Sequence, residues 1–319
     1  MAGLTAARYL AQQGWDVTVL DKGRGVGGRL ATRRIDQARA DHGAQYFSAQ
    51  SHDFKQFVDG LMAKGLITKW QPVVDTGRTD ELHTQSYYIG ADGMSAIAKE
   101  MARGLTVCTN EKVVKIQVDA TQWHVETEAG TSYRADTLIC TVPAPQALEL
   151  WQQSNLALDL TDQAALSSIV YEPCLAVMVT MNQPSKIPAP GAIAYATGDL
   201  NWVVDNQQKG ISTEPSATIH ASAAFSQKHY NDDLQGVAKL LVDQLTKWIP
   251  ADTITAMQIH RWRYSVANNR YPKPFLAAQA TLPLLFGDDG FGDDNYSGRQ
   301  QSVERAFISG RKMAAFLLR

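Results

Sequence analysis

The first 28 residues carry the pattern that most constrains the fold of this chain. Gly3 opens a segment, residues 4–11, whose apolar side chains recur at helical spacing, and Gly14 ends it. The β-rich run at 15–20 predicts a strand, and Asp21 closes that strand. Glycine, helix, strand and acid follow one another in this order after the first strand of a βαβ unit. In that unit a pyrophosphate sits on the helix N-terminus and the acid binds a ribose diol.

The loop that follows contains Gly27, Gly28 and Arg29. Glycines let a backbone approach a ligand closely, and the guanidinium fork of arginine suits phosphate oxygens. Each feature also has a plain structural reading, in which Asp21 is a turn acid and the glycine pair is a flexible loop. Four further arginines between residues 24 and 39 lack the interleaved aromatic residues that single-stranded nucleic acid would stack on. We expect one or two of them to contact phosphate and the rest to be solvated.

The start of the sequence breaks the dinucleotide-binding fingerprint. If Gly3 is its third glycine, the second would directly precede Met1, and the first strand would lie before it. We therefore expect that translation begins upstream, or that the sequence is an incomplete gene product. A sheet without that strand would leave buried backbone groups unpaired, at roughly 1–3 kcal/mol each. The test is to inspect the DNA upstream of Met1 for an in-frame segment that encodes a β-strand ending in Gly-x-Gly.

Composition excludes several classes of partner. The 319 residues are 45% hydrophobic and have a formal net charge of -2, which draws the chain neither to nucleic acid nor to a membrane. No apolar run approaches the roughly 18 residues that span a bilayer. The three cysteines lie far apart in strand-like contexts, which favours reduced, buried thiols over a metal or redox site. We expect a cytoplasmic protein with one large domain or two interleaved ones.

Periodicity predicts the remaining elements. An extended loop is expected over residues 22–41, and a strand over 67–74. Further predicted elements are helices at 53–62, 93–102, 234–248 and 302–318, short strands between 105 and 142, and strands at 174–181, 202–205, 218–221, 258–264 and 282–286. We predict an α/β fold with a discontinuous nucleotide-binding domain at 1–50, 90–145 and 280–319, and a substrate domain with a mixed sheet at 51–89 and 146–279.

The identity of the cofactor is implied by a resemblance to a known family. The opening Met1-Ala2-Gly3-Leu4 and the segments 21–34 and 41–47 resemble flavin-binding segments of the flavin amine oxidase superfamily, and most closely its renalase-like branch. Further segments that agree are 88–95, 142–146, 260–264 and 287–288 with 303–310. Their order spans nearly the whole chain. The resemblance implies a Rossmann-like FAD-binding domain of the glutathione reductase type and non-covalent FAD.

The resemblance also implies which residues hold the cofactor. Ala2 and Gly3 would lie beside the pyrophosphate, Asp21 would hold the adenosine ribose and Arg29 would approach the phosphates. The other positions that the resemblance assigns to FAD are Gln45 and Tyr46 beside the isoalloxazine ring, Val113 at adenine, Asp288 at the ribityl or pyrophosphate region, and Val303 in the helix that points its positive end at the flavin. Asp288 could instead be a turn acid, and Tyr46 could simply be packed in the core.

The activity implied by the resemblance is oxidation of isomeric dihydronicotinamide forms of NAD(P)H, with molecular oxygen as acceptor and hydrogen peroxide as product. No acid-base machinery stands out in the sequence, so catalytic residues are not assigned, and hydride loss from a dihydropyridine requires no protein base. The candidate substrate residues are Trp202, His220, His229, Trp262 and Arg263. Each has a rival explanation, since tryptophans are often core residues and a strand histidine can be satisfied structurally.

Two other functions stay open. The same scaffold serves flavin amine oxidases and desaturases, because fold does not fix function. A non-enzymatic protein that has lost its flavin is the third possibility, against which the retained Arg29, Gln45 and Asp288 argue. In each enzymatic case the partner is a small molecule, a dihydropyridine or an amine, with no nucleic acid, metal or membrane involved.

Overall fold

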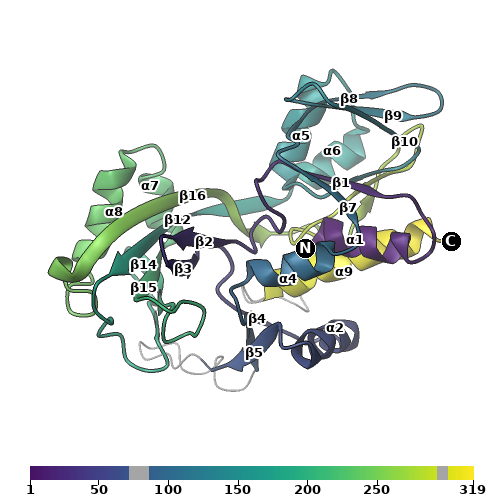
Figure 1. Ribbon diagram of the computed structural model, residues 1–319. Coiled ribbons are helices and arrows are strands. Elements are labelled where there is room, and N and C mark those ends of the chain that lie inside the picture. The colour runs from purple at the N-terminus through teal and green to yellow at the C-terminus, as the bar shows by residue number, and fades with distance from the viewer. Residues whose placement is uncertain (72–85, 293–300) are drawn as a thin grey trace. The chain divides into compact units, whose positions relative to one another are not determined.

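The chain forms two compact units in the computed structural model (Figure 1). The structure describes residues 1–71, 86–292 and 301–319. Unit 1 comprises Met1–Gly28, Ala98–Tyr171 and Val266–Arg319, and unit 2 comprises Arg29–Ile97 and Glu172–Ser265.

These boundaries differ from the predicted domain ranges. Residues 29–50 belong to unit 2, and residues 146–171 belong to unit 1. The assignment of a cofactor and a substrate to separate domains stays a prediction.

Unit 1 is built on two pairs of short parallel strands. β1 (Thr18–Asp21) pairs with β7 (Thr106–Thr109), and β11 (Leu138–Cys140) pairs with β18 (Leu284–Phe286). β17 (Leu276–Ala277) adds to β18 in the antiparallel sense. Parallel pairing brings the carboxyl ends of paired strands to the same edge, which is where ligands bind in α/β sheets.

Besides these strands, the described residues of unit 1 form a three-stranded meander and four complete helices. The meander consists of β8 (Val113–Val118), β9 (Trp123–Thr127) and β10 (Ser132–Ala135). The helices are α1 (Ala2–Ala11), α5 (Ala144–Gln153), α6 (Leu160–Ser167) and α9 (Ser302–Leu317).

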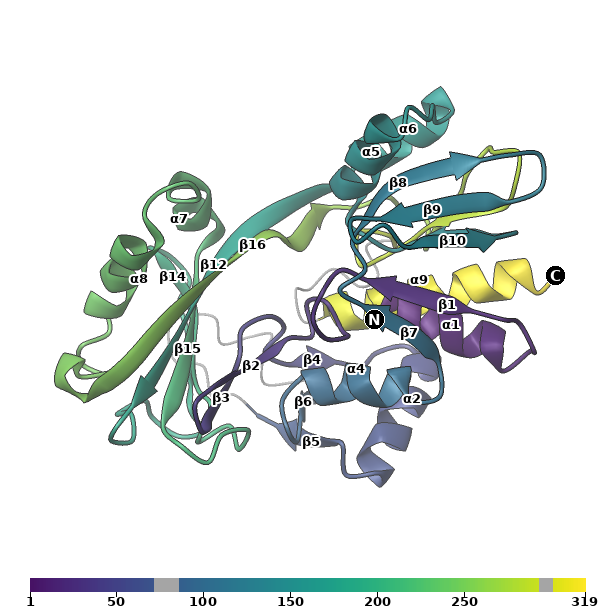
Figure 2. The ribbon, with the colours of Figure 1, turned by 45° about the horizontal axis from the view of Figure 1, so that its top comes forward.

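Helices α1 and α9 lie side by side in both ribbon views (Figures 1 and 2). The buried face of α1 includes Leu4 and Leu10, as its periodicity predicts, and Gly14 takes a φ of 84° where the chain turns toward β1. Gly310 of α9 allows the close approach, because a Cβ there would lie 2.2 Å from the carbonyl oxygen of Ala2.

Unit 2 is organised around a five-stranded sheet with the order β13-β14-β15-β12-β16. The strands are β12 (Val170–Met181), β13 (Ala192–Ala194), β14 (Leu200–Asp205), β15 (Ser216–Ala221) and β16 (Ile254–Asn269). The ends of β12 and β16 run on into residues of unit 1.

Both faces of that sheet are covered within unit 2. On one face, Val177 of β12 packs with residues of α8 (Leu234–Asp243), and α7 (Ala223–Lys228) precedes α8 on the same side (Figure 2). On the other face, Met178 packs against Ile35 and Ala40. Because both faces of β12 are buried, its sequence is a nearly continuous apolar run and does not alternate between apolar and polar residues.

A hairpin stands in part of the region predicted to be a loop. β2 (Thr32–Ile35) and β3 (Ala38–Asp41) pair in the antiparallel sense, with Asp36 in the turn at a φ of 52°. The prediction of a loop over 22–41 is therefore wrong for residues 32–41. Each strand has only four residues, and of these eight residues only Thr32 and Ile35 are of types enriched in strands.

The described part of unit 2 also contains smaller elements. They include β4 (Phe47–Ser48), α2 (His52–Ala63), β5 (Ile67–Trp70), β6 (Tyr87–Gly90) and the start of α4 (Ser95–Ala102). The predicted helices near 53–62 and 93–102 are confirmed. The strand predicted over 67–74 ends at Trp70, and residues 72–74 of that prediction lie outside the described residues. The helix predicted over 234–248 ends at Asp243.

Candidate functional site

In unit 1, the N-terminus of α1 meets the carboxyl end of a parallel strand. Thr141 directly follows β11, and a Cβ on Gly3 would lie 2.9 Å from its hydroxyl oxygen. The neighbouring strand β18 ends in the same place, because the Gly287 amide donates to the Cys140 carbonyl at 3.1 Å. Glycine at position 3 is thus explained by close packing, as the fingerprint requires of its third glycine.

Asp288 lies just past the end of β18, where its buried carboxylate is held by two donors. The Tyr171 hydroxyl donates to Oδ2 at 2.6 Å, and the Gly290 amide donates to Oδ1 at 2.7 Å. A side chain at Gly290 would collide with the Tyr171 hydroxyl, since a Cβ would lie 2.5 Å from it. The carboxylate therefore closes a turn in addition to the cofactor role that the resemblance implies.

The other residues of unit 1 for which the family resemblance implies contact with FAD lie at or near the ends of helices and strands. Asp21 is the last residue of β1 and accepts from the Gly23 amide at 2.8 Å. Val113 begins β8, and Val303 is a buried residue in the first turn of α9. Ala2 is buried at the first position of α1.

These residues fit a dinucleotide. No side chain caps α1 at Met1, and its first turn holds no acidic residue, so the positive end of the helix dipole is not countered from within the helix. A helix N-terminus at the carboxyl edge of parallel strands is a ready site for a pyrophosphate. Asp21 at the end of β1 is the type of residue that binds a ribose diol.

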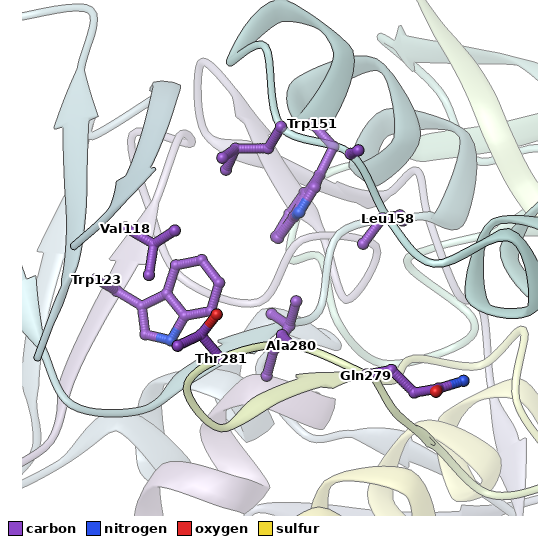
Figure 3. Close-up of a pocket in the computed structure, with 10 residues that line it drawn as sticks. Val118, Trp123, Trp151, Leu158, Gln279, Ala280 and Thr281 are labelled. Atoms are coloured by element: carbon purple, nitrogen blue, oxygen red, sulfur yellow. The ribbon is translucent and has the colours of Figure 1, made fainter. Parts of the chain in front are cut away.

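A separate cavity of about 440 Å³ also lies in unit 1 (Figure 3). Trp123 and Trp151 point into it. Leu284, the first residue of β18, also lines it. The rest of the lining is Val118, Leu156, Ala157, Leu158, Gln279, Ala280 and Thr281. A lining without a charged residue does not suit a pyrophosphate, so this cavity is not the candidate cofactor site.

In unit 2, the segment 41–46 lies over the sheet face that carries His220 and Trp202. These two residues oppose each other on β15 and β14, so their side chains share one face. The Gln45 amide nitrogen lies 3.4 Å from Nε2 of His220, and Tyr46 packs against Trp202 with ring centroids 5.2 Å apart. The structure thus brings together, within unit 2, residues predicted for cofactor and for substrate.

A third strand adds aromatic residues to this group. Trp262 of β16 stacks on His42 with ring centroids 5.4 Å apart, and its indole nitrogen donates to the His42 carbonyl at 2.7 Å. His260, two residues earlier on the same face of β16, meets His42 edge to face at 5.1 Å. His220 Nε2 lies 3.3 Å from that same His42 carbonyl. We call His42, His220, His260 and Trp262 the imidazole cluster.

The histidines at the centre of the imidazole cluster favour the uncharged form. Burial lowers the pKa of His42 to about 3, with further lowering from His260 and from the nearby Arg33 guanidinium. Burial, and then Arg33, also lowers the pKa of His260. At neutral pH this part of unit 2 therefore presents neutral rings.

Trp202 and Tyr46 also belong to a packed core. Trp202 is buried in a cluster with Trp70 and Ile89, and Tyr46 packs on that cluster. The alternative explanation for these two residues, that they pack in the core, therefore agrees with the structure.

Three other candidates are engaged elsewhere. The Arg29 guanidinium donates to the Ser265 carbonyl at 3.2 Å, Arg263 lies over the Tyr230 ring at 5.5 Å, and His229 contacts Asp232 at 2.7 Å. Because neighbouring residues of a strand face opposite sides, Arg263 cannot share the face of Trp262. The structure does not bring Arg263 or His229 to the imidazole cluster.

Sequence reasoning missed the charged residues beneath this site. Asp41 and Lys209 form an ion pair at 2.8 Å whose side chains are both fully buried. Asp41 stands next to His42 and could have been noticed, whereas nothing around Lys209 distinguishes it from a surface lysine. Over the part of the chain that the structure describes, there is no group of three histidine, cysteine or acidic residues arranged to hold a metal. Nor does any helix among these residues have the length and apolar character needed to cross a membrane.

Comparison with protein families gives two matches. Residues 1–61 match the NAD(P)-binding Rossmann-like domain, and residues 71–318 match the flavin containing amine oxidoreductase family. The second match covers most of the chain. The resemblance drawn from the sequence segments is confirmed.

Individual proteins agree with these matches. Renalase of Mus musculus is 26% identical over 320 residues, which cover 93% of this chain and 93% of that protein. Putrescine oxidase bound to putrescine superposes with a TM-score of 0.72 at 14% identity, over 99% of this chain and 96% of that one. A candidate protoporphyrinogen oxidase from an Exiguobacterium species has the same TM-score at 12% identity, over 99% and 97% of the two chains. The predicted α/β fold with a Rossmann-like domain is confirmed.

Proposed function

Because this chain belongs to the flavin containing amine oxidoreductase family and is an FAD-dependent oxidoreductase, we propose that its hydride donor is an isomeric dihydronicotinamide form of NAD(P)H. The observation that carries this proposal is the imidazole cluster of unit 2. It offers flat aromatic surfaces and neutral rings. A planar dihydropyridine needs such surfaces, and it needs no strong base.

The charge balance of the reaction favours neutral rings. Loss of a hydride converts an uncharged dihydropyridine ring into a pyridinium cation. An imidazolium within a few ångströms would oppose that change, by about 4 kcal/mol at 4 Å for an effective dielectric constant of 20. His42 and His260 avoid this cost because burial keeps them unprotonated. Trp262 adds a ring face toward which a developing cation is attracted.

FAD, when bound, supplies the acceptor for the hydride. We assign the pyrophosphate to the N-terminus of α1 at Ala2 and Gly3, and the adenosine ribose to Asp21. Asp288, Val113 and Val303 are the remaining proposed contacts in unit 1. In unit 2 the proposed contacts are Gln45 and Tyr46. Arg29 stays a proposed phosphate contact in addition to its bond to the backbone of β16.

The overall reaction is balanced with oxygen as the second substrate. One dihydronicotinamide, one proton and one O₂ give one pyridinium and one hydrogen peroxide. The two electrons and the hydrogen that leave the ring carbon, together with the proton, are recovered in the peroxide.

The test compares substrates under steady-state conditions. The FAD-loaded protein is supplied with the 2-, 4- and 6-dihydronicotinamide isomers of NADH and NADPH, and peroxide and oxidised nucleotide are both quantified. We expect equal amounts of the two products from the 2- or 6-isomer, and little from the 4-isomer. Turnover of amines alone would assign the chain to a different substrate class.

An amine is the second candidate, favoured by the aromatic residues around Tyr46. Its ring lies 6.0 Å from Trp70 and 5.2 Å from Trp202, and the faces of such rings attract a cationic amine. However, the Lys209 ammonium already lies 5.7 Å from the centre of the Trp70 ring. Putrescine is therefore included as a substrate in the same assay, with the expectation that it gives no peroxide.

A further inference from the structure

Lys209 and Asp41 form a fully buried ion pair, and the pair connects to the imidazole cluster. Asp41 Oδ2 accepts from the Lys209 ammonium, while Oδ1 accepts from the Thr32 hydroxyl and from the Met94 amide at 2.9 Å. Burial lowers the pKa of Lys209, and the Asp41 carboxylate opposes that shift. A buried ion pair is weak evidence for stability, because desolvation offsets its attraction. It is better explained by what it orients.

The pair orients the amide of Gln45. The Lys209 ammonium lies 3.3 Å from Gln45 Oε1, and Gln45 Nε2 donates to the Asp41 carbonyl. The opposite amide orientation would place an N–H against the ammonium and an oxygen against a carbonyl oxygen. Lysine has only donors and a carbonyl has only acceptors, so the contacts admit one orientation.

The oriented amide then determines the proton position on His220. Gln45 Nε2 has a second hydrogen, and the His220 Nε2 atom lies 3.4 Å away. If His220 Nε2 carried a proton, two N–H groups would face each other. The His42 carbonyl also lies 3.3 Å from His220 Nε2 and accepts the shorter bond from Trp262 at 2.7 Å. Its second lone pair could accept a proton from His220, but that arrangement would leave the second hydrogen of the Gln45 amide facing another N–H. An unprotonated His220 Nε2 uses every hydrogen of the Gln45 amide.

We propose that Lys209 is a positioning residue that acts through Gln45 to hold His220 as a neutral imidazole, with its proton on Nδ1. All four residues of this relay, Asp41, Lys209, Gln45 and His220, lie in unit 2. The role assigned to the relay rests on the proposed function: it keeps a third ring of the imidazole cluster uncharged where a pyridinium forms. Of the charged groups in the described residues, Arg33 acts on the pKa values of His42 and His260, and Lys209 and Asp41 reach the cluster through Gln45.

The first experiment measures the proton position directly and requires no turnover. The FAD-loaded protein is labelled with ¹⁵N-histidine, and the His220 imidazole signals are assigned by their loss in His220→Gln. We expect Nδ1 to be protonated and Nε2 to be unprotonated at neutral pH. In Gln45→Glu, an oxygen replaces the donor that faces His220, so Nε2 should become protonated. A wild-type His220 with its proton on Nε2, or a Gln45→Glu variant with unchanged signals, would overturn the proposal.

The second experiment removes the ion pair without leaving a buried charge. The double variant Lys209→Met with Asp41→Asn should release the Gln45 amide, so that His220 Nε2 gains a proton in part of the molecules. The matched control is Lys239→Met, which removes an exposed lysine that pairs with Asp243 at 2.6 Å in α8. The control should leave the His220 signals unchanged. If the His220 signals are also unchanged in the double variant, Lys209 does not position His220. If the double variant does not fold, the Gln45→Glu variant still tests whether the Gln45 amide sets the proton position on His220.

A kinetic measurement separates this inference from the proposed function. The rate of flavin reduction by a dihydronicotinamide isomer should be nearly independent of pH from 5 to 8 in the wild type. In the double variant it should fall roughly tenfold toward pH 5, as His220 becomes able to take up a proton. Absence of reduction by every isomer in the wild type would refute the proposed function and leave the ¹⁵N result standing. A double variant with the wild-type pH profile would refute the relay.

Discussion

Replacing Gly310 with alanine should separate α1 from α9 and weaken FAD binding. A Cβ at this position would lie 2.2 Å from the Ala2 carbonyl oxygen and 2.9 Å from Thr5 Cβ, whereas ordinary contacts begin at 3.4 Å. The obstacle is backbone rather than a mobile side chain, so α1 must move by about 1 Å to relieve the contact.

The magnitude combines two opposing effects. Overpacking of this kind costs about 3 kcal/mol at the upper end of its usual range. Alanine is favoured over glycine inside a helix by about 1 kcal/mol. The expected result is a net loss of about 2 kcal/mol in the free energy of unfolding, or roughly 4–8 °C in melting temperature. Because the displaced segment begins at Ala2, where the pyrophosphate is assigned, the variant should also retain less FAD after gel filtration.

Gly60 provides a matched control. It lies inside α2, and a Cβ there meets no atom within 4 Å. Gly60→Ala should therefore raise the free energy of unfolding by about 0.5–1 kcal/mol and leave FAD retention unchanged. Urea unfolding followed by circular dichroism, together with flavin absorbance per chain, measures both effects. Equal stability changes in the two variants would refute the packing argument.

Two further changes probe single groups. His42 has a pKa of about 3 in the folded chain against 6.5 for an ordinary histidine, so protons bind the unfolded chain preferentially and stability is lost as pH falls below 6.5. We expect His42 to contribute at most about 2 kcal/mol to the loss between pH 6.5 and 5. His42→Asn should remove this contribution, whereas the exposed His52→Asn should keep it, and the same pH dependence of the free energy of unfolding in urea for all three proteins would contradict this. Tyr171→Phe removes the donor to Asp288 Oδ2 and should cost about 1–3 kcal/mol and weaken FAD binding in equilibrium dialysis. Unchanged FAD affinity in Tyr171→Phe would show that the orientation of Asp288 does not matter to the cofactor.

Local sequence patterns were sufficient to predict the elements around Gly3 and Asp21. Helix α1, the turn at Gly14 and strand β1 follow from periodicity and residue type within 20 residues. Such elements need no information from distant parts of the chain. The hairpin at 32–41 was missed although it is equally local, because its strands have only four residues each and few of those residues are of types that favour strands.

The interactions beneath the imidazole cluster could not be predicted from a single sequence. Lys209 and Asp41 are separated by 168 positions, and each belongs to a residue type that is usually exposed. His220 and Trp262 were chosen as candidates from residue type alone, and the sheet register brings both to His42. Arg263, chosen on the same basis, faces the other side because strand alternation separates it from Trp262.

The central claim is that this FAD-dependent oxidoreductase takes its hydride from an isomeric dihydronicotinamide. The most direct measurement is anaerobic mixing of the FAD-loaded protein with each purified isomer in a stopped-flow spectrometer. The account predicts rapid and complete loss of the oxidised flavin absorbance with the 2- or 6-isomer, followed by recovery when oxygen is admitted. No loss of that absorbance with any isomer, or a loss with putrescine alone, would contradict it.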